Sequence, residues 1–279
     1  MQLSEKRWEE INAKLPNAAE IQSRLLLSVD LIAMKVGPEK KLDVATVCLR
    51  DASEVAWEVV YALGQAYASL VWFREEHPEA PLETKACVLG KFYTDDAALR
   101  LYAAAEHIAN FILAFLEIEK SVLEPYEEKN ASRAHVVGKY LIAEMPVHAI
   151  TLAVKDLLAE ENWNRVMHYR NIWVHEQPPL IEGVGIVYER KGRWTKTEHG
   201  YVGIGNSDKP QYTVDYLIEM VSSASHALMK VLATLTMILF ECLRAMGIEI
   251  DESGQITIRF GPGKSVAESN PTKESNDGP

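Results

Sequence analysis

Apolar residues recur every three or four positions along most of the first two thirds of the 279-residue chain, which is the spacing of amphipathic helices. Prolines and glycines separate these periodic stretches, because proline cannot continue a helix. The pattern predicts a mainly α protein built as an antiparallel helical bundle. The clearest helical stretches cover residues 18–36, 43–76, 94–116, 147–160, 162–175 and 212–246.

Two short regions depart from the helical spacing. Residues 183–196 alternate between apolar and polar around Lys191-Gly192, which predicts a β-hairpin inserted into the bundle at about residues 181–211. A small second hairpin is predicted at residues 248–260, directly after the last helical stretch.

These patterns divide the chain into four parts. The last part is rich in Gly, Pro, Ser, Asn and charge and has no aromatic residue, so we expect it to be a disordered tail. The predicted parts are an N-terminal helical extension at residues 1–42, a helical bundle with its hairpin insertion at 43–247, the small hairpin at 248–260 and the tail at 261–279.

Composition narrows the classes of function. The formal net charge of -11 repels nucleic acid at long range, so we expect no binding of duplex DNA and only local contact with any nucleic acid. Three widely spaced cysteines predict neither a disulfide nor a metal site, and we expect no cofactor. The first ten residues do not resemble a secretory signal, and the longest apolar run, 231–240, is about half of a membrane span. We therefore expect a cytoplasmic protein.

One predicted helix, residues 161–175, concentrates the polar chemistry of the chain. On a helical wheel Arg170 falls in the middle of an apolar stripe, while His168, Asn171 and His175 share the adjoining polar face. A half-buried guanidinium needs a partner, so we expect Arg170 to meet a carboxylate, a cluster of carbonyl groups or a bound anion. An internal ion pair would use one of three carboxylates on the preceding long helix, Asp95, Asp96 or Glu106.

The segment Arg170-Asn171-Ile172-Trp173-Val174-His175 resembles the Arg-x4-6-His motif of the HEPN superfamily, including the polar residue after the arginine. The likeness covers roughly residues 43–247. It implies an antiparallel bundle with the motif at the end of a late helix. It also implies a homodimer in which the arginines and histidines of both subunits meet in a cleft.

The resemblance further implies a metal-independent ribonuclease. His175 would be the general acid or base and Arg170 the phosphate clamp, with Asn171 orienting them, because histidine changes charge near neutral pH and arginine stabilises phosphate charge. Arg165 and His168 are candidates for further contacts with the substrate. Some HEPN toxins paired with an antitoxin carry a tyrosine two residues after the histidine, where this chain has Gln177, so an antitoxin partner is a weaker expectation.

Three hypotheses therefore stand. The first is a HEPN ribonuclease of a defence, stress or toxin system that cuts RNA by attack of the 2′-OH. The second is a HEPN-fold module that binds a nucleotide or RNA without cutting it. The third is a helical interaction protein in which Arg170 and His175 only stabilise the fold. The sequence does not identify the RNA target, the biological trigger or the role of the hairpin.

Overall fold

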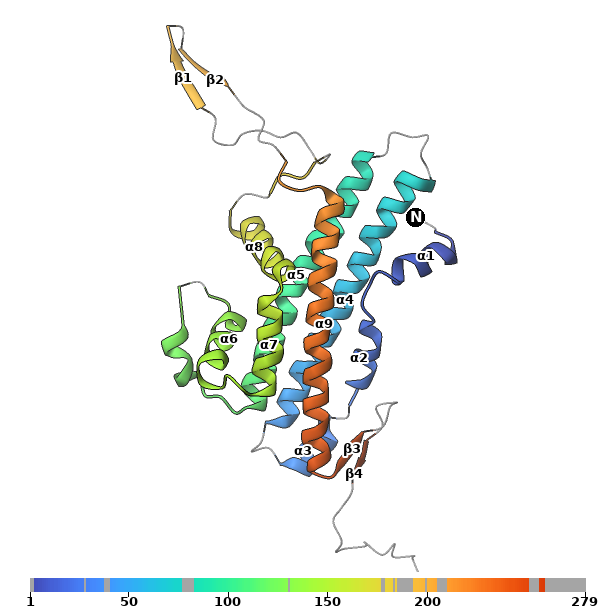
Figure 1. The fold of residues 1–279 in the computed structure, drawn as a ribbon, viewed down its shortest axis with the longest axis vertical. Coiled ribbons are helices and arrows are strands. Elements are labelled where there is room, and N and C mark those ends of the chain that lie inside the picture. Colours follow the sequence, from blue (N-terminus) through green and yellow to red (C-terminus); the bar gives the residue numbers. More distant parts are fainter. Residues whose placement is uncertain are drawn as a thin grey trace, which may run out of the picture.

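The structure is a computed structural model. It describes residues 3–27, 29–37, 41–76, 83–129, 131–176, 179–182, 184, 193–198, 200–204, 210–250 and 256–258. The protein is mainly helical, and its long helices form a bundle (Figure 1). The predicted tail at 261–279 lies outside the described residues.

Three long helices form the centre of the bundle: α4 (Leu42–Val71), α5 (Glu83–Phe115) and α9 (Val214–Ala245) (Figure 1). A π-helical turn, η2 (Trp72–Glu76), extends α4. Small side chains allow these helices to approach closely. A Cβ added to Gly90 of α5 would lie 3.0 Å from Cγ1 of Val214, so the Val214 side chain would have to shift slightly to admit a larger residue.

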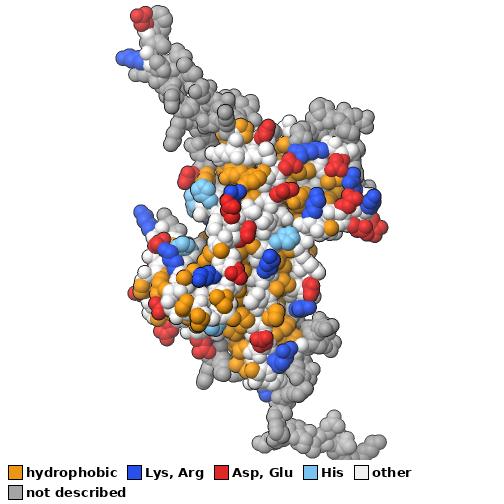
Figure 2. All heavy atoms as spheres, in the orientation of Figure 1, with side chains coloured by type: hydrophobic (Ala, Val, Ile, Leu, Met, Phe, Trp, Pro, Cys, Tyr) orange, Lys and Arg blue, Asp and Glu red, His pale blue; other side chains and the backbone are white. Residues whose placement is uncertain are grey.

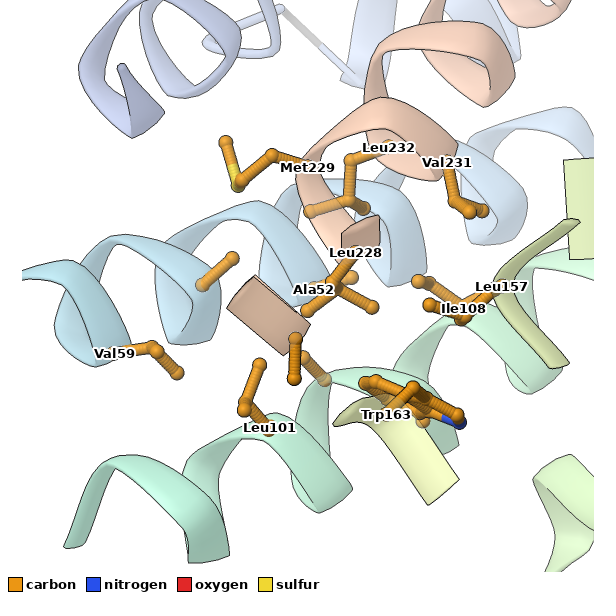
Figure 3. Close-up of a cluster of buried hydrophobic side chains, with 14 of the residues drawn as sticks. Ala52, Val59, Leu101, Ile108, Leu157, Trp163, Leu228, Met229, Val231 and Leu232 are labelled. Carbon is orange, nitrogen blue, oxygen red and sulfur yellow. The ribbon is translucent and has the colours of Figure 1, made fainter. Parts of the chain in front are cut away.

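The core lies where α4, α5, α8 and α9 meet. Figure 3 shows Leu101 and Ile108 of α5 beside Leu228 and Leu232 of α9, with Trp163 of α8 in the same cluster. Leu101 and Leu232 have no exposed surface and Trp163 is 4% exposed, so the start of α8 is held by the core.

Four shorter helices lie along one side of the long helices (Figure 1): η3 (Lys120–Tyr126), α6 (Arg133–Glu144), α7 (Ala149–Ala159) and α8 (Glu161–His175). Side chains cap the starts of two of them. The Ser132 hydroxyl accepts from the His135 N–H at 3.1 Å, and His148 Nδ1 accepts from the Ile150 N–H at 3.2 Å. Glu160 is the only residue between α7 and α8, so these two helices change direction sharply.

The N-terminal part contributes α1 (Glu5–Asn12), α2 (Ala18–Arg24) and α3 (Val29–Val36). The predicted single helix over 18–36 is wrong, because the chain leaves the helix after Arg24. Leu25 and Leu27 are 0% and 3% exposed. Both side chains belong to the main core cluster, so the non-helical segment between α2 and α3 is held by the core.

The predicted start of a helix at residue 94 is also wrong, because α5 runs without interruption from Glu83. Thr94 resembles a cap in the sequence, but its hydroxyl donates to the Gly90 carbonyl at 2.7 Å inside the helix. Asp95 next to it is buried and has partners of its own, described below. Bonds inside α5, and for Asp95 also a bond from α8, therefore satisfy polar groups that otherwise indicate a helix start.

Two pairs of short strands complete the described structure. Strand β1 (Arg193–Thr197) pairs antiparallel with β2 (Gly200–Ile204), with Thr197 opposite Gly200. This pair lies within the predicted insertion at about residues 181–211, and β1 covers the predicted second strand, while the Lys191-Gly192 turn and most of the predicted first strand lie outside the described residues. Strands β3 (Ile248–Ile250) and β4 (Ile256–Ile258) are antiparallel, and Ile248 is fully buried.

By length and composition alone, α9 is the one described helix that could cross a membrane. A core helix of a folded bundle passes the same test. In the structure α9 packs against α2, α4, α5, α7 and α8, and Leu232, Leu235 and Leu239 on it have no exposed surface. Its apolar character is explained by these contacts.

Candidate functional site

The site is built on α8, which a buried tyrosine attaches to α5. Tyr169 has no exposed surface, and its hydroxyl donates a hydrogen bond to Oδ1 of Asp95. Lys91 of α5 donates to the other oxygen of that carboxylate. Burial, and then the neighbouring Asp95 charge, raise the pKa of Tyr169, so its hydroxyl stays protonated and able to donate.

This attachment rotates α8 relative to the predicted wheel. The buried residues of α8 are Trp163, Val166 and Tyr169, while Val174 of the predicted apolar stripe is 43% exposed. Arg170 therefore lies at the edge of the buried face and is only half-buried. From this position its guanidinium reaches solvent while its stem remains packed.

Arg170 has contacts but no carboxylate partner among the residues described. Its guanidinium carbon lies 3.9 Å from the centre of the Tyr102 ring of α5, a cation–π geometry. Its Nη1 donates to Oδ1 of Asn171 at 3.0 Å and lies 3.3 Å from Nε2 of His175. Its Nε is buried without a hydrogen-bond partner. The positive charge of this side chain is therefore not neutralised within the described structure.

The three carboxylates that could have neutralised Arg170 have other partners. Asp95 is bonded to Tyr169 and Lys91, as above. Asp96 accepts from Nε of Arg100 at 2.9 Å, and Glu106 accepts from the Ala134 N–H at 3.1 Å. The expected internal ion pair of Arg170 is thus not formed with any of them. Another possibility from the sequence, binding of an external anion, stays open.

Arg170, Asn171 and His175 line the mouth of a cleft of about 950 Å³ between α5, α6, α7 and α8. The guanidinium has only donors, so a hydrogen bond between Arg170 and His175 makes Nε2 of His175 the acceptor and places the ring proton on Nδ1. The structure therefore brings together all three residues that the motif predicts as catalytic.

The two other predicted site residues do not line this cleft. Arg165 is exposed, forms an ion pair with Glu161 and donates to the Tyr216 hydroxyl, and the Glu161 charge raises its pKa. His168 is exposed one turn further along and is not among the cleft residues. Their prediction as substrate contacts has no geometric support at the cleft.

The opposite rim of the cleft carries charges of both signs. His135 of α6 and Lys129 lie there with Glu128, whose carboxylate accepts from Lys139 and lies 3.6 Å from Nε2 of His135. The hydrogen bond from Lys139 lowers the pKa of Glu128, so this carboxylate is ionised at neutral pH. In the face drawn in Figure 2, acidic and basic side chains are interspersed. Any attraction of a phosphate on this face is therefore local.

Two residues of the site were not singled out from the sequence. Tyr102 and Tyr169 fall within periodic apolar stretches, where an aromatic residue is typical of the core. The sequence offered one signal, because Tyr102 and Glu106 are four residues apart and share one face of the predicted helix. That spacing does not indicate which residue of α8 Tyr102 contacts. Among the described residues, no group of three or more His, Cys, Asp or Glu side chains could hold a metal ion.

Comparison of the chain with protein-family models, with curated proteins and with solved structures found no match.

Proposed function

We propose that the protein is a metal-independent endoribonuclease of the HEPN type. One observation carries this proposal: among the residues that the structure describes, the Arg170 guanidinium has no carboxylate partner, and it contacts His175 at the mouth of an open cleft. A partly buried cation without a counter-ion is costly, and a phosphate of RNA would neutralise it. The adjacent histidine supplies the acid–base group that RNA cleavage needs.

The proposed reaction is an internal transfer of the phosphate. His175 accepts the proton of a ribose 2′-OH, and the 2′-oxygen forms a bond to the adjacent phosphorus. The bond from phosphorus to the 5′-oxygen breaks, and a protonated histidine delivers a proton to that oxygen. The products carry a 2′,3′-cyclic phosphate and a 5′-hydroxyl. Arg170 stabilises the charge that develops on the non-bridging oxygens, and Asn171 holds the guanidinium through its Oδ1.

The reaction needs one group that accepts a proton and one that delivers a proton, which favours a site formed by residues of two chains. Each chain offers one His175 beside one Arg170, so we further propose a homodimer in which α8 of each subunit faces the other across a twofold axis. We propose a cytoplasmic role in defence, stress or toxin activity, where an antitoxin could bind the same cleft.

Cleavage with EDTA present is the direct test. Purified wild-type protein should cut total RNA and leave 2′,3′-cyclic phosphate ends, because this reaction requires no metal. His175→Ala should lower the rate on the order of 10²- to 10⁴-fold, the typical contribution of a general acid or base. His226→Ala removes an exposed histidine of α9 that lies outside the cleft, so it should cut at the wild-type rate.

A second candidate function, binding of RNA or a nucleotide without cleavage, is favoured by one contact. Nε2 of His175 is already within hydrogen-bond distance of Arg170, so it is not free to accept a substrate proton until the guanidinium moves to the phosphate. If wild-type protein binds labelled RNA but wild type and His175→Ala leave it equally intact, the binding function is the correct one. Equal cutting by both proteins would indicate a contaminating nuclease.

A further inference from the structure

The cleft has two chemically distinct parts. Its mouth carries polar groups, which are exposed or half-exposed, including Arg170, Asn171 and His175. Behind the mouth the lining is apolar and comes from α5, α6 and α7. Ile108, Val137 and Leu157 there are 5%, 1% and 7% exposed. A phosphodiester and its ribose need only the first part, so the second part has no role in the reaction proposed above.

The size of the whole cleft restricts its occupant. A volume of about 950 Å³ is in the range of pockets that hold a whole small molecule rather than one anion. Within the apolar part, Leu158 of α7 is 37% exposed and is therefore accessible to an occupant. In RNA, the apolar surface attached to a phosphate at Arg170 is the face of a nucleobase.

We propose that this apolar wall is a subsite for one unstacked nucleobase whose own phosphate lies at Arg170. The inference rests on the proposed function, because it places the base relative to the phosphate clamp. A base attached to that phosphate lies within a nucleotide's length of the guanidinium, and apolar contact with its face requires no particular sequence. Lys129 and His135 on the opposite rim would face the next part of the backbone.

The subsite makes single-stranded RNA the substrate class. A base paired and stacked inside a duplex cannot enter a cleft without being extruded, which is energetically unfavourable. Apolar contact between the base and the cleft residues would offset only part of this unfavourable energy. Duplex RNA should therefore bind through its backbone alone.

A wall substitution with a matched control tests the subsite. Ala134 is half-buried on α6 and lines the cleft, whereas Ala143 is exposed on the same helix and does not. Ala134→Leu and Ala143→Leu would each be combined with His175→Ala, so that RNA is bound but not cut. The probes are a short fluorescent oligouridylate, an abasic ribose-phosphate oligomer of equal length, and the oligouridylate within a duplex.

We expect the abasic oligomer and the duplex to bind about tenfold more weakly than the oligouridylate, the scale of one stacked base. Ala134→Leu should weaken the oligouridylate to the abasic level and leave abasic binding unchanged, which also shows that the variant is folded. Ala143→Leu should change neither. Equal binding of intact and abasic oligomers overturns the subsite but not the proposed function. Absence of binding to every probe overturns both.

Discussion

The Arg170 guanidinium is held by a ring and an amide instead of a carboxylate. Tyr102 lies against its face, and Asn171 accepts from its edge. Contacts of this kind fix the plane of the guanidinium and leave its charge available. A structural arginine would normally be paired with a buried carboxylate, because an unpaired internal charge is unstable. The surroundings of Arg170 therefore favour recognition of an external anion.

Arg170→Lys separates a phosphate clamp from a structural anchor. Lysine keeps the charge and most of the stem but loses the planar fork that binds two phosphate oxygens at once. No carboxylate bond is lost, since the described structure contains none at this side chain. We therefore expect a melting temperature within a few degrees of wild type and cleavage lower by about 10²- to 10³-fold. Thermal melts and single-turnover cleavage would be measured together.

The opposite pattern would contradict the clamp. If Arg170→Lys costs on the order of 2 kcal/mol of unfolding free energy while each folded molecule cuts at the wild-type rate, the arginine serves stability alone.

The orientation of α8 depends on one buried hydrogen bond together with the core. Trp163 fixes the start of the helix in the core, and Tyr169 fixes its rotation through Asp95 of α5. Lys91 completes the group by bonding Asp95, and its ammonium lies 5.9 Å from the centre of the Trp173 ring. These contacts direct the opposite side of α8, with Asn171 and His175, to the cleft.

Tyr169→Phe removes only the hydroxyl and leaves the Asp95 carboxylate with Lys91 as its remaining side-chain partner. We expect a loss of about 1–3 kcal/mol in unfolding free energy at pH 7, the cost of a buried hydrogen bond to a charged group. Urea unfolding of both proteins would measure it.

The pH dependence of this difference follows from the raised pKa of Tyr169. Because the pKa of Tyr169 is raised in the folded protein, its hydroxyl contributes fully to the unfolding free energy below the unfolded tyrosine pKa of about 10. This contribution is lost as the pH rises above that value. Wild type and Tyr169→Phe should therefore approach each other in stability above about pH 10. A gap that stays constant or widens there would show that the hydroxyl is not the buried donor described.

At the scale of the whole molecule, the proposed function requires two chains. Light scattering at tens of micromolar, a concentration range where a specific interface of standard size is occupied, should give twice the chain mass of 31.3 kDa. Mixing Arg170→Lys with His175→Ala should restore part of the cleavage if each composite site draws residues from both chains. A protein that is only monomeric and still cuts RNA would show that one chain holds the complete site.

Two features could be predicted from the sequence: the mainly helical fold class, and the helix at residues 161–175 that carries the candidate site. Period 3.6 follows from backbone geometry, so apolar spacing predicted the long helices around residues 43–76 and 212–246. The spacing of Arg170, Asn171 and His175 placed them within about one and a half turns of each other at a helix end. Local geometry alone decides both of these features.

Contacts between distant segments decided the rest. The segment between α2 and α3 buries Leu25 and Leu27 in the common core, a tertiary contact that helical periodicity does not predict. Whether Arg170 meets a carboxylate depends on the other partners of Asp95, Asp96 and Glu106, which are far from it in sequence. The sequence limits these partners to a set of candidates, since charge and helix face are local properties. The packing of α8 on α5 places the Arg170 guanidinium on the Tyr102 ring, at the cleft. Only the tertiary structure decides this, because three-dimensional proximity determines which buried donor bonds to which carboxylate.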